Sequence, residues 1–278
     1  MKVVVDGLYV QGAQHHECED YAVFHADESI QFAAISDGCS GSGHSSVGAR
    51  LLTLACRQVL LSMEPNERSS IGYQELGKKI ISQAHAAASL LYPDSSLLDA
   101  TLVCAFTDHV KQRVIAMIYG DGGITWKTDN ADVEHMWVEY PSGYPNYLSY
   151  QLDEGRKQAL DAVSEKGMVQ SWIRLGKDAE NIPMGIQEPT YVILPMEGLQ
   201  WLMVSSDGLD TFFDSEAGRG LGKEDVVTEL SNVKGLHGEF VRRRVTRMLK
   251  QYQKQGISHG DDLSVAGLAF IDEQVESA

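Results

Sequence analysis

The chain has 278 residues, of which 43% are hydrophobic and 22% charged, and its formal net charge is -16. This length can bury one large core without dividing in two, and the balance is ordinary for a globular protein. The negative charge argues against nucleic-acid or anionic-membrane partners, and no apolar run reaches the roughly 18 residues of a membrane span. The four cysteines form no Cys-x-x-Cys pair and, without a signal-peptide pattern, are expected to be reduced thiols in a cytoplasmic protein.

Short apolar runs predict strands along most of the chain. The expected strands cover residues 1–12, 21–25, 31–36, 100–107, 113–119, 124–128, 133–140, 191–194, 200–205 and 263–271. The dipeptide Asp6-Gly7 predicts a turn that would make the first of these a hairpin.

Apolar residues at helical spacing predict the helices. They are expected over residues 47–60, 76–91, 156–167, 224–231 and 236–252. Ser45 or Ser46 would cap the first helix, a polar break over 64–70 would follow it, and Pro93 would end the second. Residues 141–189 have the weakest periodicity. Strands gathered around two helices, with two more helices after them, favour α+β packing over alternating βαβ units.

Carboxylates stand where four of the expected strands begin or end. These acids are Glu19, Asp20, Asp37, Asp207, Asp261 and Asp262. Residues at strand ends can meet in a folded sheet, and carboxylates that meet repel one another unless a cation neutralises them. A set of oxygen ligands suits Mg²⁺ or Mn²⁺ better than zinc.

The order and spacing of these acidic turns resemble the metal-dependent serine/threonine phosphatases of the PP2C type. Six elements match the family in chain order: Gly12 through Glu19-Asp20, Asp37-Gly38 with its loop to His44, Ala100–Val103, Gly120–Gly122, Ser206–Leu209 and Asp261–Val265. One Asp-Gly pair is a weak signal, but six ordered elements cover nearly the whole chain. The resemblance implies a four-layer αββα sandwich of two antiparallel sheets flanked by helix pairs. It also implies one phosphatase domain over residues 1–278, with a variable flap at about 141–189.

The resemblance further implies a metal site built from these turns. Its ligands would be Glu19, Asp20, Asp37, Gly38, Asp121, Asp207 and Asp261. Asp37 would bridge two ions, Gly38 would supply a carbonyl oxygen, and Asp121 would hold a weaker third ion. Either Asp261 or Asp262 is the ligand at the last turn, and Asp261 is favoured.

Three positions depart from the family pattern. His15 stands where the family commonly has an arginine that binds the substrate phosphate; as a candidate catalytic residue beside Asp37, it lacks arginine's permanent charge and fork of donors. Cys39 follows Asp37-Gly38 where many members have histidine or methionine, so no general acid carries over. Thr211 stands where an extra acid is usual; Asp210 beside it could substitute for that acid, but it is expected to cap or solvate the next segment.

The implied function is hydrolysis of phosphoserine and phosphothreonine on proteins, by a bridging water activated between two Mn²⁺ or Mg²⁺ ions. A Ser/Thr kinase pathway is the expected partner. Two alternatives stay open: a weak or inactive binding module on the same fold, and a phosphatase of small phosphoesters. A zinc site at His15, His16 and Cys18 is disfavoured, because no spacing nominates its remaining ligands.

Overall fold

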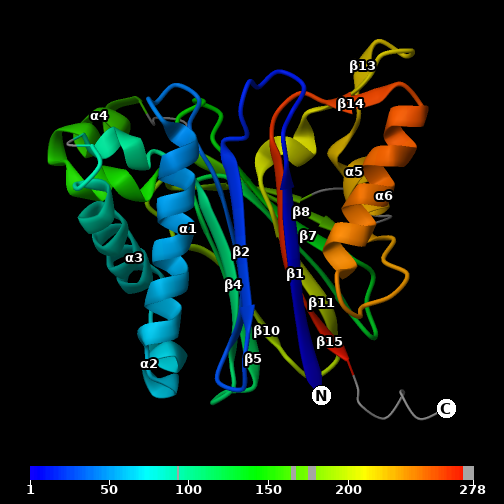
Figure 1. Cartoon of the computed structure of the whole chain (residues 1–278), viewed down its shortest axis with the longest axis horizontal. Coiled ribbons are helices and arrows are strands. Elements are labelled where there is room, and N and C mark those ends of the chain that lie inside the picture. The colour runs from blue at the N-terminus through cyan, green and yellow to red at the C-terminus, as the bar shows by residue number, and fades with distance from the viewer. Residues whose placement is uncertain (93, 164–166, 175–179, 272–278) are drawn as a thin grey trace.

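The computed structural model describes residues 1–92, 94–163, 167–174 and 180–271. Two large antiparallel sheets lie face to face between two groups of helices (Figure 1), which confirms the expected α+β sandwich. Buried apolar side chains form three clusters: one between the sheets and one between each sheet and its helices. No helix in these described residues is long and apolar enough to cross a membrane.

The larger sheet has seven strands in the order β1-β15-β11-β6-β7-β8-β9. Their bounds are β1 (Lys2–Val10), β15 (Leu263–Ile271), β11 (Leu199–Ser205), β6 (Gly122–Thr128), β7 (Glu134–Glu139), β8 (Met168–Arg174) and β9 (Glu180–Met184). The five-stranded sheet has the order β10-β5-β4-β3-β2. Its strands are β10 (Thr190–Pro195), β5 (Arg113–Tyr119), β4 (Leu102–Asp108), β3 (Gln31–Asp37) and β2 (Asp20–Ala26). A small sheet joins β13 (Arg219–Gly220), β12 (Phe212–Asp214) and β14 (Ile257–His259).

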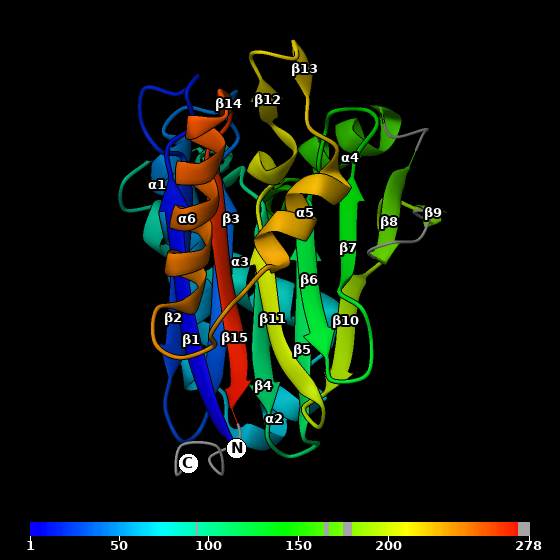
Figure 2. The same ribbon diagram turned by 90° about the vertical axis from the view of Figure 1, so that its right-hand side faces the viewer.

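The helices cover the outer faces of the two large sheets. The five-stranded sheet carries α1 (Ser45–Ser62), α2 (Pro65–Ser70) and α3 (Tyr73–Ala88). The seven-stranded sheet carries α5 (Lys223–Ser231) and α6 (Phe240–Lys254), which Figure 2 shows in front of it. The remaining helices are α4 (Glu154–Val163) and the 3-10 turns η1 (Ser95–Leu98), η2 (Leu148–Leu152) and η3 (Asp207–Asp210).

The expected turn at Asp6-Gly7 is wrong, because both residues lie in the middle of β1. They pair with Gly267 and Ala266 of β15. A Cβ on Gly7 would stand 2.8 Å from the Cβ of Ala266, so glycine here permits close packing of two strands. Asp6 is buried, and its Oδ2 accepts a hydrogen bond of 2.8 Å from the backbone N–H of Arg242 in the first turn of α6. The acid therefore caps a helix.

The expected serine cap of α1 is also wrong. The residue before the helix is His44, which has a left-handed backbone (φ 65°) and no side-chain capping bond. Ser45 lies inside the helix, and its hydroxyl donates to Glu19 Oε1 instead. Within the polar break expected over 64–70, the structure forms α2. The second expected helix ends at Ala88, and Pro93 lies outside the described residues.

Segment 141–189 contains more regular structure than its weak periodicity indicates. Besides η2 and α4, its described part holds β8 and β9, which extend the large sheet beyond β7. Four of the five residues of β9 are exposed, and the strand contains Pro183. An exposed edge strand needs no apolar alternation and tolerates proline, so it leaves little signal in the sequence.

Candidate active site

The register between β2 and β3 places two predicted metal ligands opposite each other. Asp20 begins β2, Asp37 ends β3, and the two are paired across the ladder. Thr101 fixes the second acid from both sides: its hydroxyl accepts from the Asp37 N–H at 3.1 Å, and its own N–H donates to the Asp37 carbonyl at 2.8 Å. The next residue, Gly38, is buried and forms a bridge with Ala100. Backbone pairing thus determines where the Asp37-Gly38 turn lies.

Ser206 connects this pair of acids to the seven-stranded sheet. It follows β11, and its hydroxyl donates to Asp20 Oδ2 at 2.7 Å while accepting from the N–H of Ser264 at 2.9 Å. Asp207 comes next and opens η3. A Cβ on Gly208 would lie 1.9 Å from the carbonyl oxygen of Asp262, so only glycine fits between the two turns. These contacts fix the position of Ser206-Asp207-Gly208 relative to the start of β15.

Asp121 stands in the turn between β5 and β6, flanked by two glycines with positive φ. Gly120 has φ 88° and Gly122 has φ 129°, backbone conformations that residues other than glycine rarely adopt. Tyr147 of segment 141–189 is buried close by, and Asp121 contributes to raising the pKa of its phenol, after burial itself. This charge interaction indicates that the part of segment 141–189 around Tyr147 lies near the acids.

Burial and mutual repulsion raise the pKa values of these carboxyl groups. Burial is the largest cause of the raised pKa of Asp37, and the charges of Asp20, Asp207 and Asp121 raise it further. Asp37 and Asp121 keep some exposed surface, but protein atoms surround them on most sides. Burial likewise raises the pKa of Asp20 to about 7 and that of Asp121 to about 8. Four acids so close together cannot all be charged unless a cation joins them.

Two carboxylate oxygens in this cluster are suited to bind a cation. Asp20 Oδ1 and Asp207 Oδ1 are buried and have no hydrogen-bond partner in the structure. Buried acceptors without donors are rare in proteins, and oxygen ligands suit Mg²⁺ and Mn²⁺. No three His, Cys, Asp or Glu side chains in the described part of the chain already form a coordination shell. The donor chemistry therefore fits a divalent ion, and binding one requires the side chains to draw together.

The two acids of the last turn have different surroundings. Asp262 is buried, and its two oxygens accept from the N–H groups of Gly12 at 2.7 Å and Glu19 at 2.6 Å. It therefore fastens the β1–β2 loop to β15. Asp261 is 34% exposed, and its Oδ1 accepts from the Asp262 N–H at 2.8 Å. Backbone donors occupy both oxygens of Asp262, which favours Asp261 as the acid available to an ion.

His15 lies against three carboxylates. Its Nε2 is 3.0 Å from Asp261 Oδ1, and its Nδ1 is 3.3 Å from both Glu19 Oε2 and Asp262 Oδ2. The structure thus places this residue among the predicted ligands. Its phosphate-binding role stays a prediction.

Asp99 joins the Asp37-Gly38 turn to segment 141–189, and the sequence reading missed it. Its carbonyl accepts from the Cys39 N–H at 2.9 Å. Its buried carboxylate accepts from Ser149 at 2.6 Å, Arg156 at 2.6 Å and Ser42 at 3.1 Å. An acid in a loop next to Ala100 gives no local signal of such a role. Thr101 and Ser206, by contrast, lie inside elements that match the family, so the sequence does point to them.

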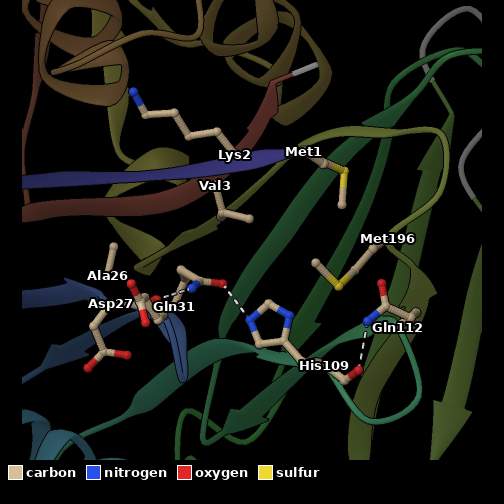
Figure 3. Close-up of a pocket in the computed structure, with 10 residues that line it drawn as sticks. Met1, Lys2, Val3, Ala26, Asp27, Gln31, His109, Gln112 and Met196 are labelled. Carbon is tan, nitrogen blue, oxygen red and sulfur yellow. Dashed lines mark hydrogen bonds between the residues drawn. The ribbon is translucent and has the colours of Figure 1, made fainter. Parts of the chain in front are cut away.

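A cavity at the opposite end of the sheets shows no comparable chemistry (Figure 3). It is lined by Met1, Lys2, Val3, Ala26, Asp27, Glu28, Gln31, His109, Gln112 and Met196. The ring of His109 is within 2.9 Å of Gln31 Oε1 and 3.3 Å of Thr107 Oγ1, and Asp27 is paired with His25. These groups satisfy one another, so the acid-bearing end is the candidate active site.

Comparisons with known proteins identify the family of the chain and its fold. The sequence profile of the family described as Protein phosphatase 2C matches residues 12–259. A search of the curated proteins finds no match.

Among solved structures, the serine/threonine phosphatase Stp1 from Staphylococcus aureus is similar, with a TM-score of 0.59 and 12% identity over 98% of this chain and 96% of that one. The S. agalactiae serine/threonine phosphatase gives a TM-score of 0.56 and 14% identity, over 97% of this chain and 100% of that one. The Mycobacterium tuberculosis phosphatase PstP/Ppp gives 0.50 and 16%, over 97% and 99%. These likenesses show the shared fold. Because the profile spans most of its length, the chain belongs to the protein phosphatase 2C family, whose activity is metal-dependent dephosphorylation of serine and threonine in proteins.

Proposed function

We propose that this phosphatase uses Mn²⁺ or Mg²⁺ and that its active centre lies at the acid-bearing end of the two sheets. The observation that carries the proposal is the pair of buried, unpartnered oxygens, Asp20 Oδ1 and Asp207 Oδ1, beside Asp37. Two ions, and a weaker third, would be held by the side chains of Glu19, Asp20, Asp37, Asp121, Asp207 and Asp261 and by the carbonyl of Gly38.

Asp37 is the acid that the other proposed ligands surround. Asp20 faces it across the strand pair, and Asp207 and Asp121 are close enough for their charges to raise its pKa. A carboxylate among three others is suited to be shared between two ions. Asp121, in a separate turn beside Tyr147, is suited to the third.

The surrounding residues orient these acids. Ser206 donates to Oδ2 of Asp20, which leaves the other oxygen of that carboxylate without a donor. Thr101 holds the backbone of Asp37, and Asp262 holds the loop that carries Glu19. When bound, divalent ions would neutralise the acids and the substrate phosphate and activate a water for attack on phosphorus.

We assign His15 to the phosphate side of the site. Its Nε2 faces Asp261 at 3.0 Å. Turning away from that acid would free this N–H to donate to a phosphate oxygen, although with neither the permanent charge nor the paired donors of arginine.

Residues 1–278 are proposed to form one phosphatase domain, with segment 141–189 as a variable flap that influences substrate choice. The role is supported by Tyr147 and by the bonds of Asp99 to Ser149 and Arg156, which connect residues 147–156 to the acid-bearing turn. The substrate is a phosphorylated protein, supplied by a Ser/Thr kinase pathway in this proposal. The four unpaired cysteines support a cytoplasmic location.

The test is hydrolysis of p-nitrophenyl phosphate by the chelator-treated protein, alone and with Mg²⁺ or Mn²⁺. Activity is expected only with added ion. Calorimetric titration of Mn²⁺ gives a second readout, in which Asp37→Asn should lose binding and Asp132→Asn, at an exposed position between β6 and β7, should retain it. Full activity in the presence of a chelator, or unchanged Mn²⁺ binding by Asp37→Asn, would contradict the assignment.

A further inference from the structure

The exposed face of α6 is strongly basic in a chain whose formal net charge is -16. The helix contains six basic residues and no acidic one. Arg244 is buried and pairs with Glu229. The five exposed cations are Arg242, Arg243, Arg247, Lys250 and Lys254. We define these five as the α6 basic face.

Three members of the α6 basic face have no protein partner. Arg247, Lys250 and Lys254 form no ion pair or side-chain hydrogen bond with any residue that the structure describes. Arg243 donates to two loop carbonyls, and Arg242 has one long contact with Glu239 at 3.7 Å. Positions 243, 247, 250 and 254 follow helical spacing, so they form a row about 16 Å long. Unpaired charges in one row are available to a partner.

The other face of α6 limits what that partner can be. Val241, Val245, Met248 and Tyr252 are buried against the seven-stranded sheet, so no apolar side remains to enter a lipid layer. The overall negative charge opposes nucleic acid at long range. A short acidic protein segment is repelled less than a long nucleic acid, because it carries fewer charges and salt screens charges beyond about 8–10 Å, so the nearby row of cations dominates. Guanidinium and ammonium groups both bind carboxylates.

The α6 basic face is followed closely in the chain by an acid of the candidate active site. After Lys254 the chain enters β14, at the top of Figure 1, and Asp261 follows β14 by two residues. Lys254 and Asp261 are seven positions apart in the sequence, so their Cα atoms are at most about 25 Å apart. An extended substrate covers that distance in about seven residues.

We propose that the α6 basic face binds an acidic segment of the phosphoprotein substrate, within about seven residues of the phosphorylated side chain. This inference rests on the proposed function, since it takes the acid-bearing end as the place of hydrolysis. The α6 basic face would supply affinity for the protein, and the acids at the sheet ends would supply the chemistry.

The test uses two phosphothreonine peptides that differ only in a run of five glutamates or five glutamines, placed seven residues from the phosphothreonine. The wild-type protein should hydrolyse the glutamate peptide with about tenfold higher kcat/KM at low salt, and the advantage should shrink as salt screens it. Arg247→Glu should remove the preference, and Arg247→Gln should reduce it. Arg57→Glu, an exposed arginine on α1, makes the same change in net charge and should leave the preference intact.

Both reversals should hydrolyse p-nitrophenyl phosphate at the wild-type rate, which also shows that they fold. Equal turnover of the two peptides by wild type, or equal loss in Arg57→Glu and Arg247→Glu, would overturn the inference. So would Arg247-dependent binding of duplex DNA or anionic vesicles without a peptide preference. Absence of any ion-dependent hydrolysis of p-nitrophenyl phosphate would instead refute the proposed function, so the two failures are distinguishable.

Discussion

The acids at the sheet ends and residues 147–156 lie close together, but different interactions hold them. Asp20 and Asp37 are placed by the register of β2 and β3, and Asp207 by the end of β11. Many backbone hydrogen bonds would have to break before any of these moved. Within segment 141–189, β8 is held by backbone pairing with β7, but residues 147–156 reach the acids through side chains, chiefly Tyr147 and the bonds that Asp99 accepts from Ser149 and Arg156.

This difference separates the chemistry of the site from its selectivity. Positions fixed by sheet register are the same for every substrate. Residues 147–156, which are attached to the acid-bearing turn by a few side-chain bonds, can change in sequence without disturbing the acids. Substitutions among the acids should therefore change turnover of every substrate, whereas substitutions in segment 141–189 should change the preference between substrates.

The largest effect is expected for Asp37→Asn. Loss of the central carboxylate should lower turnover of p-nitrophenyl phosphate and of a phosphopeptide by the same factor, of more than about a hundredfold. The measurement is kcat for both substrates in saturating Mn²⁺, with Asp132→Asn, an exposed acid between β6 and β7, as the matched control outside the cluster. A loss confined to the phosphopeptide would show that Asp37 belongs with selectivity and not with chemistry.

The adjacent acids Asp261 and Asp262 should separate activity from stability. Asp262→Ala removes the acceptor of two backbone N–H groups and should lower the free energy of unfolding by about 3 kcal/mol. Asp261→Ala should change stability little and lower the affinity for Mn²⁺. Urea unfolding and calorimetric Mn²⁺ titration of both variants check this. The reverse pattern would exchange the roles of the two acids.

The acid cluster should make the metal-free protein less stable as pH rises. Asp20 and Asp121 have folded pKa values of about 7 and about 8, above the value of 3.8 for a free carboxyl group. The folded state therefore binds more protons than the unfolded state, so this contribution is full below pH 4 and is lost as pH rises towards 8. Each such group contributes a slope of up to about 1.4 kcal/mol per pH unit.

Urea unfolding in the presence of a chelator, between pH 5 and pH 8, measures that slope. Other groups also titrate, so the informative quantity is the difference between wild type and Asp37→Asn. The variant should gain stability over wild type as pH rises, because one buried charge is missing. A difference that does not change with pH would mean that the acids do not repel one another.

The sequence predicted most of this fold because its apolar runs are local signals. β5 and β15 have the predicted bounds, and the acids stand at strand ends where the motifs placed them. Features that depend on contacts with residues far away in the chain could not be predicted from the sequence. Asp6-Gly7 reads as a turn until Ala266 and Arg242 are known to face it.

The candidate site shows the same limit. The motifs nominated both Asp261 and Asp262, and what distinguishes them is which one Gly12 and Glu19 reach from the other end of the chain. Asp99 was missed because its partners come from three separate segments. The weak periodicity of segment 141–189 would suggest that Tyr144–Tyr150 could be replaced by a flexible linker. The structure shows that this change would remove three buried residues, Tyr147, Leu148 and Ser149.

The smallest effect is expected where segment 141–189 is attached. Arg156→Gln breaks the ion pair of 2.6 Å with buried Asp99 and loosens the tie between this segment and the Asp37-Gly38 turn. Turnover of a phosphoprotein should fall several-fold, while turnover of p-nitrophenyl phosphate stays within about twofold, because the sheet register still holds the acids. The loss of stability should be about 1–3 kcal/mol, since Ser149 and Ser42 still donate to Asp99.

Arg113→Gln is the matched control for this variant. It breaks a similar pair, 2.8 Å from Arg113 to buried Asp108, at the end of β5 away from Asp121. It should cost similar stability and change both substrates equally little. The ratio of kcat/KM for phosphoprotein to that for p-nitrophenyl phosphate is therefore the quantity to compare. If Arg156→Gln and Arg113→Gln leave this ratio the same, segment 141–189 does not set selectivity through Asp99, and the contrast between the two regions fails at this contact.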